Sequence, residues 1–392
     1  MRIAFYAPLK APSHETPSGD RRVAALFVDA LQHAGHEVEL VSTFRSYEGT
    51  GDAARQAALR EQGLGVARHL VAGWRAGPPS ARPDLWFTYH VYYKAPDWPG
   101  PHASAALGIP YVIAEASFAP KRADGPWALG HEASRQAIQR ADLILSPTRF
   151  DTVCLESLVT NRERIALIPP FLDPRPFQGA ARERVTHRAR LAAALAIDPE
   201  VPWIVVAAMM RPGDKLASYR ELAAALARIG DLRWHLLVAG GGAARAEVET
   251  MLEAAAPGRC RMLGAVALAE IAALYAAGDL CLWPAVNEAY GMAMLEAQAT
   301  GIPVVSCALR GVPDVVIDGR TGLLAPAADV EALARLARRL LVDAPLRAAM
   351  GRAAAEFVAA ERSLGAAAMR LDQGLARVRT GTALPSAPST AS

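Results

Sequence analysis

The length and composition of the chain indicate a folded protein with two hydrophobic cores. It has 392 residues, of which 52% are hydrophobic and 21% are charged, and one core rarely organises so long a chain. The formal net charge of +3 argues against a nucleic-acid partner, because nucleic-acid-binding proteins concentrate basic residues. The four cysteines form no Cys-x-x-Cys pair, which favours reduced core residues over a disulfide framework or a zinc site.

The sequence also suggests in which cellular compartment the protein lies. The apolar run at residues 1–8 is too short for a signal peptide, and no other run approaches the ~20 residues that span a bilayer. We therefore expect a cytoplasmic protein, with any membrane contact peripheral and at the inner face. Residues 380–392 are rich in Ser, Thr, Ala and Pro and carry no charge, which predicts a disordered tail.

In the first half of the chain, short apolar runs alternate with longer runs of helical period. The alternation predicts buried parallel strands separated by helices. The first strand is followed by a Pro/Ser/Gly loop and a helix at residues 21–34, which Gly35 closes. Strands are expected at residues 2–7, 36–42, 84–88, 110–114 and 143–146.

The second half repeats the alternation after a proline-rich connection at residues 165–177, whose four prolines prevent a continuing helix. Helices are expected at residues 218–229 and 244–255, the second after a glycine turn at residues 240–242. Further strands are expected at residues 203–208, 234–239, 280–283 and 303–306.

This order of elements predicts an α/β protein with two Rossmann-like doubly wound domains facing across a cleft. We expect a first domain at residues 1–170 and a second domain at residues 171–365. A helix at residues 366–379 is expected to pack back on the first domain. Ligands of such sheets bind beyond the carboxyl ends of the strands, so the cleft is the expected active site.

The most informative segment follows the expected strand at residues 280–283. Glu288 lies in a loop, a helix begins near Gly291, and Glu296 lies about one turn inside that helix. The first N–H groups of a helix lack internal partners and can bind a phosphate. A sugar joined to a ribose through a diphosphate needs donors in the middle and hydroxyl acceptors at both ends. Two carboxylates flanking a helix start match that need.

Two glutamates separated by seven residues, followed by Gly-Ile-Pro-Val-Val and Gly-Val-Pro-Asp-Val-Val, resemble the donor signature of family-4 retaining glycosyltransferases, which have the GT-B architecture. The resemblance covers almost the whole chain. It implies that Glu288 contacts donor-sugar hydroxyls and that Glu296 holds the ribose hydroxyls. The loop between them is implied to offer backbone donors to the sugar and phosphates, from Tyr290, Gly291, Met292 and Ala293.

Two cations follow the first strand of the second half. Lys215 is the only lysine of that half, and Arg211 precedes it at the expected edge of the cleft. The resemblance implies that this pair binds the diphosphate and stabilises it as it leaves, although the spacing is one residue shorter than the family pattern. A surface turn is the alternative interpretation. The glycine turn at residues 240–242 is interpreted as a tight turn that lines the nucleotide end of the expected cleft.

The first-half loop departs from the family pattern, which has two glycines where this chain has Gly19 and Asp20. Gly19 can let the donor approach, while Asp20 either caps the following helix or contacts the acceptor. Many relatives carry a histidine after the fourth strand, where this chain has Glu115. His90, at the end of the third strand, is either a structural residue or an acceptor-side residue.

We therefore expect a hexosyltransferase-like enzyme that moves a sugar from a nucleoside diphosphate sugar to an acceptor hydroxyl with retention of configuration. The acceptor is expected to be a saccharide, a lipid-linked molecule or a small molecule, in cell-envelope or exopolysaccharide synthesis. No cofactor and no metal is expected, since the sequence contains no Asp-x-Asp pair. A nucleotide-sugar epimerase or hydrolase, and a non-catalytic nucleotide-sugar-binding protein, are the alternatives.

Overall fold

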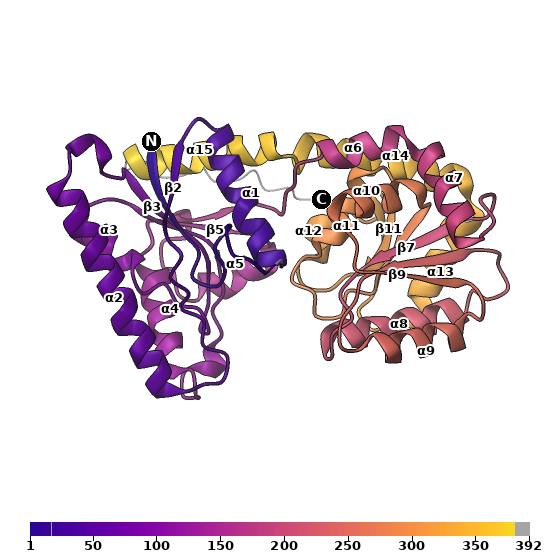
Figure 1. Cartoon of the computed structure of the whole chain (residues 1–392), viewed down its shortest axis with the longest axis horizontal. Coiled ribbons are helices and arrows are strands. Elements are labelled where there is room, and N and C mark those ends of the chain that lie inside the picture. Colours follow the sequence, from indigo (N-terminus) through magenta and orange to yellow (C-terminus); the bar gives the residue numbers. More distant parts are fainter. Residues whose placement is uncertain (17, 381–392) are drawn as a thin grey trace. The chain divides into compact units, whose positions relative to one another are not determined.

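The structure is a computed structural model that describes residues 1–16 and 18–380 (Figure 1). The chain divides into two compact units. The first unit contains Met1–Pro169 and the chain from Leu364 onward, and the second contains Pro170–Ser363. Of the tail expected at residues 380–392, all but Thr380 lies outside the described residues.

A six-stranded parallel sheet forms the centre of the first unit, in the order β2-β1-β3-β4-β5-β6. The order reverses between β1 and β3, because the chain adds β2 on one side of β1 and every later strand on the other. The strands are β1 (Arg2–Tyr6), β2 (Glu37–Ser42), β3 (Leu85–Val91), β4 (Tyr111–Ala116), β5 (Leu143–Ser146) and β6 (Ile165–Leu167).

Side chains of β3 show how helices come to cover both faces of this sheet. Successive side chains of a strand point to opposite faces. Trp86 meets Trp74 of α2 edge-on, with ring centroids 6.4 Å apart. The next residue, Phe87, meets Phe27 of α1 at 5.9 Å. The helices α1 and α2 therefore lie on opposite faces.

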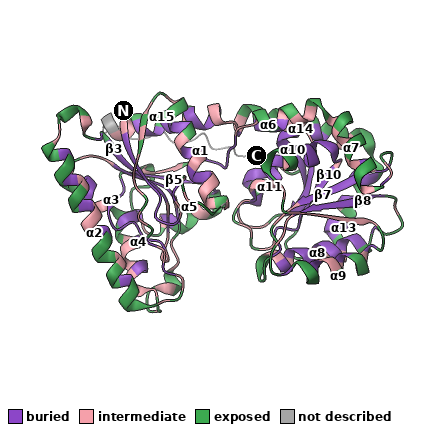
Figure 2. Ribbon diagram, viewed as in Figure 1, coloured by how far each residue is buried: buried purple, intermediate pink, exposed green. Residues whose placement is uncertain are grey.

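The helices of the first unit form two layers, with α1 and α15 packed together and α2, α3 and α4 packed together. They are α1 (Gly19–His33), α2 (Ala53–Ala76), α3 (Gly100–Leu107), α4 (Ala128–Arg140), α5 (Arg149–Glu156) and α15 (Leu364–Thr380). Three short 3₁₀ turns lie at Pro79–Ala81, Pro120–Arg122 and Arg162–Arg164. Figure 2 shows the buried strands between helices whose outer faces are exposed.

The second unit has its own six-stranded parallel sheet, in the order β12-β11-β10-β7-β8-β9. Here the order reverses between β7 and β10. The strands are β7 (Trp203–Ala207), β8 (His235–Ala239), β9 (Cys260–Gly264), β10 (Leu280–Leu282), β11 (Val304–Cys307) and β12 (Gly322–Ala325).

Helices again cover both faces, with α8 packed against α9 and α13, and α10 packed against α6, α7 and α11. Their bounds are α6 (Arg175–Arg182), α7 (Arg184–Leu195), α8 (Asp214–Ala227), α9 (Arg245–Ala255), α10 (Leu268–Ala277), α11 (Met292–Ala299), α12 (Val312–Val315), α13 (Val330–Val342) and α14 (Ala344–Glu361). No helix among the described residues is both long and apolar enough to cross a bilayer.

The predicted α/β architecture is confirmed, and each expected strand is present. Sequence patterns did not reveal β6, β9 and β12. The helix expected at residues 218–229 is α8, which begins at Asp214, so Lys215 lies in its first turn and not in a loop. The prediction that all four cysteines lie in a core is wrong for Cys154, which is exposed.

Candidate active site

The donor residues expected in the second unit follow two strands that lie side by side. β7 pairs directly with β10, and the strand order reverses between them. Arg211 and Lys215 follow β7, and residues 288–291 follow β10. A parallel doubly wound sheet binds ligands beyond the carboxyl ends of the strands at this reversal. The topology therefore brings the expected residues of this unit to the position where such a sheet binds its ligand.

Lys215 and Glu288 form an ion pair, in which the Lys215 ammonium donates to Glu288 Oε2. Trp283 supports both residues, because its indole N–H donates to the same oxygen at 3.4 Å and its ring centroid lies 5.5 Å from the Lys215 nitrogen. The Trp283 ring packs edge-on against Tyr219 of α8 at 5.0 Å. The side chains of Lys215 and Glu288 are 25% and 20% exposed, so the pair is sheltered but open to a ligand.

The loop that carries Glu288 is fixed by its neighbour Asn287. The Asn287 amide donates to Asp214 Oδ2 at 2.9 Å and accepts from Arg310 Nη1 at 2.7 Å. One residue earlier, the backbone N–H of Val286 donates to Ser218 Oγ at 2.9 Å. These bonds tie the loop after β10 to the start of α8 and to the loop after β11, so the position of Glu288 is fixed from two sides.

Sequence reasoning missed Trp283, Asn287 and Arg310. Asn287 has a φ of 51°, in the left-handed region that asparagine tolerates better than most residues. An asparagine directly before the glutamate was therefore a usable signal. Trp283 carried no comparable signal, because an aromatic residue that ends an apolar strand is ordinarily a packing residue.

The loop ends at Gly291, which is the N-cap of α11. Gly291 has a φ of 77°, and a Cβ atom there would lie 2.2 Å from Cε of Met294. Met292 and Ala293 form the first turn of α11 and are partly exposed, and Tyr290 packs against the core of this unit. The start of α11 therefore combines a residue without a side chain and N–H groups that the helix itself does not use.

Glu296 lies one turn further into α11 and is only 4% exposed. Burial, followed by the negative charge of Glu296, raises the pKa of the Cys281 thiol to about 12. This places the Glu296 carboxylate within electrostatic reach of β10. The carboxylate is therefore buried inside the unit, close to β10.

Arg211 is exposed, and no hydrogen bond or ion pair engages its guanidinium within the part of the chain that the structure describes. Its carbonyl accepts from the N–H of Leu216 in the first turn of α8 at 3.1 Å. The backbone of Arg211 is thus fixed next to Lys215 while its side chain extends into solvent.

The glycine turn at residues 240–242 holds the segment that leads to Arg211. Met210 donates to the carbonyl of Gly241 at 2.9 Å, and Ala244 donates to the carbonyl of Met210 at 2.9 Å. A Cβ atom at Gly240 would lie 1.9 Å from the carbonyl oxygen of Ala208. Gly240 is therefore needed for the close approach of two backbones.

The acceptor-side residues expected in the first unit also come together. His90 Nδ1 lies 2.8 Å from Asp20 Oδ1, and His90 Nε2 lies 3.9 Å from Glu115 Oε1. The phenol of Tyr89 donates to Glu115 Oε2 at 3.2 Å, and the ring of Tyr92 stacks on His90 with centroids 5.0 Å apart. We call Asp20, His90 and Glu115 the His90 cluster.

The backbone of the His90 cluster is unusual at two neighbouring strand ends. His90 has a φ of 64° and Glu115 has a φ of 62°. Residues other than glycine rarely adopt this left-handed backbone conformation. Such conformations persist where the surrounding structure holds them, and they concentrate at functional sites. They lie at the ends of β3 and β4, next to the reversal of strand order in this sheet.

The structure corrects the expectation that Asp20 caps a helix starting at residue 21. The helix α1 starts at Gly19, and Ser18 is its N-cap, with Oγ accepting from the N–H of Arg21 at 3.2 Å. Asp20 lies in the first turn and is bound to His90, while Gly19 is exposed. The capping interpretation of Asp20 is therefore wrong.

Charge in the His90 cluster shifts the pKa values of two groups. Burial disfavours the charged form of His90, but the charge of Glu115, the hydrogen bond and charge of Asp20, and the charge of Asp151 outweigh it, so the pKa of His90 lies above 6.5. Burial likewise acts to raise the pKa of Asp20, yet the hydrogen bond with His90 and its charge hold this pKa below 3.8. A charged His90–Asp20 pair is therefore favoured.

Among the described residues, no group of three or more His, Cys, Asp or Glu side chains is arranged to hold a metal ion.

Comparisons with known proteins show which family the chain belongs to. Residues 202–343, which contain β7 to β12, match the model of the family "Glycosyl transferases group 1". A protein of Xylanimonas cellulosilytica named D-inositol 3-phosphate glycosyltransferase is 30% identical over 312 residues, which cover 74% of this chain and 72% of that protein. This chain belongs to the group 1 glycosyltransferases.

Other group 1 relatives align over a shorter part. The D-inositol 3-phosphate glycosyltransferase of Corynebacterium aurimucosum is 30% identical over 244 residues, covering 61% of this chain and 57% of the relative. The chain thus spans little more than half the length of such relatives. Among solved structures, HepE of Anabaena in complex with UDP aligns with a TM-score of 0.72 at 16% identity, covering 96% of this chain and 100% of HepE. The fold is therefore the GT-B fold of glycosyltransferases.

The glycine turn of this glycosyltransferase can be tested with two neighbouring substitutions. Gly240→Ala forces a Cβ atom against the carbonyl of Ala208, and we expect it to lower the free energy of unfolding by roughly 2 kcal/mol or more. Gly241→Ala is the control, because the nearest atom to its Cβ lies 3.9 Å away. Urea unfolding followed by circular dichroism measures both. Equal effects of the two substitutions would contradict the close-approach explanation.

The His90 cluster predicts a pKa change that NMR can follow. Asp20→Asn removes a charge that favours the protonated imidazole, so the pKa of His90 should fall, whereas Asp29→Asn on the same helix should leave it unchanged. Because the folded-state pKa of His90 is raised, the pair stabilises the fold fully below pH 6.5 and loses this effect as pH rises through the folded pKa. The decrease in the free energy of unfolding caused by Asp20→Asn should therefore become smaller as the pH rises through the folded-state pKa of His90. An unchanged His90 titration would rule out the pair.

Proposed function

We propose that this protein transfers a glycosyl group from a nucleoside diphosphate sugar to an acceptor hydroxyl, with retention of the anomeric configuration. The observation that carries the proposal is the Lys215–Glu288 pair beside the start of α11, at the reversal of strand order in the second sheet. Family membership supports it, as does the likeness in fold to HepE, whose structure has also been solved with UDP-glucose.

The diphosphate of the donor would bind at the start of α11. Lys215 and Arg211 supply two positive charges, and a helix N-terminus adds roughly half a charge. Gly291 leaves the helix start open to the phosphate oxygens. Arg211, which extends into solvent, can approach the diphosphate without giving up a partner in the described part of the chain.

Donor binding would exchange the partners of the ion pair. When Lys215 turns from Glu288 to a phosphate oxygen, the Glu288 carboxylate becomes available to the hydroxyls of the sugar. Glu296, buried one turn deeper, would accept from the ribose hydroxyls. The two side chains thus compensate each other in the ion pair, and groups of the donor would compensate both of them in the complex.

In the transfer step, the acceptor oxygen forms a bond to the anomeric carbon on the face from which the diphosphate leaves, which retains the configuration. The bond between the anomeric carbon and the phosphate oxygen breaks, and the acceptor proton passes to the departing oxygen. The protein contributes by orienting both substrates and by stabilising the negative charge that develops on the diphosphate. Lys215, Arg211 and the start of α11 supply that stabilisation.

The acceptor side is assigned to the His90 cluster of the first unit. Its two carboxylates surround one imidazole, so the cluster offers hydrogen-bond acceptors suited to hydroxyl groups. Gly19 lies at the start of the same helix as Asp20. We assign a saccharide, lipid-linked or small-molecule acceptor from cell-envelope or exopolysaccharide synthesis.

The test begins with a panel of nucleoside diphosphate sugars, since a ligand that binds the folded state raises the melting temperature. The stabilising donor is then incubated with candidate acceptors, and products are followed by mass spectrometry and anomeric NMR. Transfer with retention supports the proposal. Interconversion of the sugar, inversion, or binding without any release of nucleoside diphosphate contradicts it.

Three substitutions separate the roles of the donor residues. Glu296→Ala should weaken donor binding by about 1.5 to 3 kcal/mol, because a hydroxyl pair loses a charged acceptor. Glu288→Ala and Lys215→Ala should chiefly lower turnover. Lys121→Ala, an exposed lysine of the first unit, is the matched control. Isothermal titration and initial rates measure the effects, and parental behaviour of all three variants would reject the donor site.

We also propose that transfer requires no divalent metal, because two cations and a helix start nearly balance a diphosphate. Turnover should persist in excess EDTA and should not rise with added magnesium or manganese. Lys215→Ala should cost far more activity than the chelator does. Loss of transfer in EDTA with recovery on adding metal would show this part of the proposal to be wrong.

A further inference from the structure

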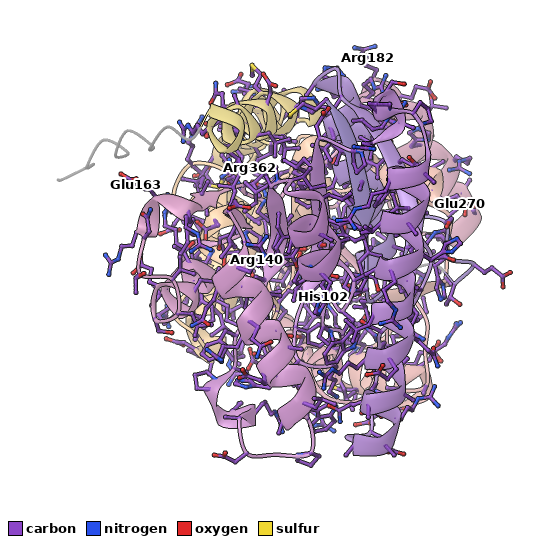
Figure 3. The ribbon with its side chains drawn as sticks, turned by 90° about the vertical axis from the view of Figure 1, so that its left-hand side faces the viewer. His102, Arg140, Glu163, Arg182, Glu270 and Arg362 are labelled. Atoms are coloured by element: carbon purple, nitrogen blue, oxygen red, sulfur yellow. The ribbon has the colours of Figure 1, made fainter. Side chains whose placement is uncertain are left out.

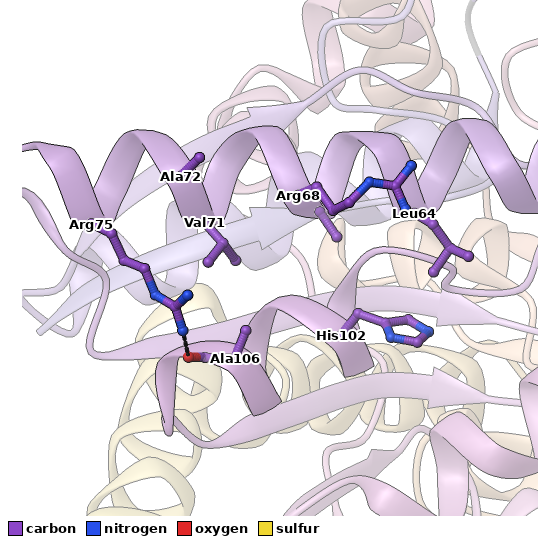
Figure 4. A pocket seen from close by; sticks show the side chains of 8 residues that line it. Leu64, Arg68, Val71, Ala72, Arg75, His102 and Ala106 are labelled. Atoms are coloured by element: carbon purple, nitrogen blue, oxygen red, sulfur yellow. Dashed lines mark hydrogen bonds between the residues drawn. The ribbon is translucent and has the colours of Figure 1, made fainter.

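A groove of 380 Å³ lies between α2 and α3 of the first unit. Its apolar lining includes Leu64, Val71 and Ala106, and its polar lining consists of Arg68, Arg75 and His102 (Figure 4). Figure 3 shows this side of the molecule, with His102 labelled. None of these residues belongs to the candidate active site, so the groove needs an explanation of its own.

The groove is positively charged. The helix α2 contains four arginines and a single carboxylate, Glu61. Arg60 and Arg68 form no ion pair within the described part of the chain. Burial first, and then the charges of Arg60 and Arg68, lower the pKa of His102. Two guanidinium groups therefore act on one neutral imidazole without a compensating carboxylate.

The other end of the groove is bridged by a hydrogen bond. Arg75 Nη2 donates to the carbonyl oxygen of Ala106 at 2.6 Å, which joins the last turns of the two helices (Figure 4). Val71, which is buried, lies between this bond and His102, and Leu64 lies at the His102 end of the groove (Figure 4). The charge of Arg68 therefore lies toward the end at Leu64 and His102, and the apolar lining continues along α2 toward Arg75.

We propose that this groove binds an anionic amphiphile, with a phosphate-type head at Arg68 and His102, on the side toward Arg60, and a short apolar body against Leu64, Val71 and Ala106. Arg60 does not line the groove itself, but it lies four residues before Leu64 and eight before Arg68, on the same face of α2. Arginine is suited to phosphate because its planar fork donates two parallel hydrogen bonds. The groove lies within the usual size of small-molecule sites, about 300 to 1,000 Å³. The site is independent of the donor chemistry in the second unit.

The test uses hexyl phosphate as the probe, with inorganic phosphate and hexanol as its two halves. Isothermal titration should show hexyl phosphate binding more tightly than either half. The same ligand should raise the pKa of His102 in an NMR titration, because an anion favours the imidazolium. Arg60→Gln and Arg68→Gln should each weaken binding by about tenfold, the loss of one charge-assisted hydrogen bond.

Arg55→Gln is the matched control, because Arg55 lies nine residues before Leu64, on the opposite face of the same helix, and it should bind like the parent. Circular dichroism checks that each variant keeps its fold. Equal affinity for inorganic phosphate and hexyl phosphate would contradict the proposal that the groove binds an amphiphile, because it would show that the apolar lining contributes nothing and that the site binds a simple anion. Binding of anionic vesicles without binding of hexyl phosphate would show a membrane-contacting surface instead. An unmoved His102 titration would exclude the groove.

Discussion

The pairing of β7 with β10 is the constraint on which the donor residues depend. Asp279, directly before β10, fixes this pairing at the opposite end of the strands, because its carboxylate accepts from the backbone N–H of Trp203, at the start of β7, at 2.8 Å. The same carboxylate binds Arg184 and Arg188 at 2.7 and 2.8 Å. With the two strands in register, the residues that follow them are delivered to one edge of the sheet.

At that edge, charge compensation holds the two side chains together. A sheltered cation or carboxylate without a partner is costly, and breaking such a pair costs more than forming it contributes. Lys215 and Glu288 compensate each other while Trp283 limits where they can lie. The first unit follows the same principle, since His90 is compensated by Asp20. Each unit thus has its polar cluster at a reversal of strand order.

The architecture could be predicted from the sequence because central parallel strands are buried on both faces and therefore appear in it as unbroken apolar runs. The strands that it did not reveal, β6, β9 and β12, lie at sheet edges, and β9 is only partly buried along its length. Glu288 and Lys215 were identifiable by resemblance, but they are 73 residues apart. Their contact could not be foreseen, since it follows from which strands are neighbours.

The route of the chain has a consequence for how the protein is made. The second unit is one continuous segment, Pro170–Ser363, whereas the first unit needs both Met1–Pro169 and the chain from Leu364 onward. Leu371 and Leu375 of α15 are fully buried, and α15 packs on α1 and β5. On the ribosome, residues Met1–Pro169 must therefore wait with an uncovered apolar surface until α15 emerges. The unit synthesised second can complete its core before the one that began earlier.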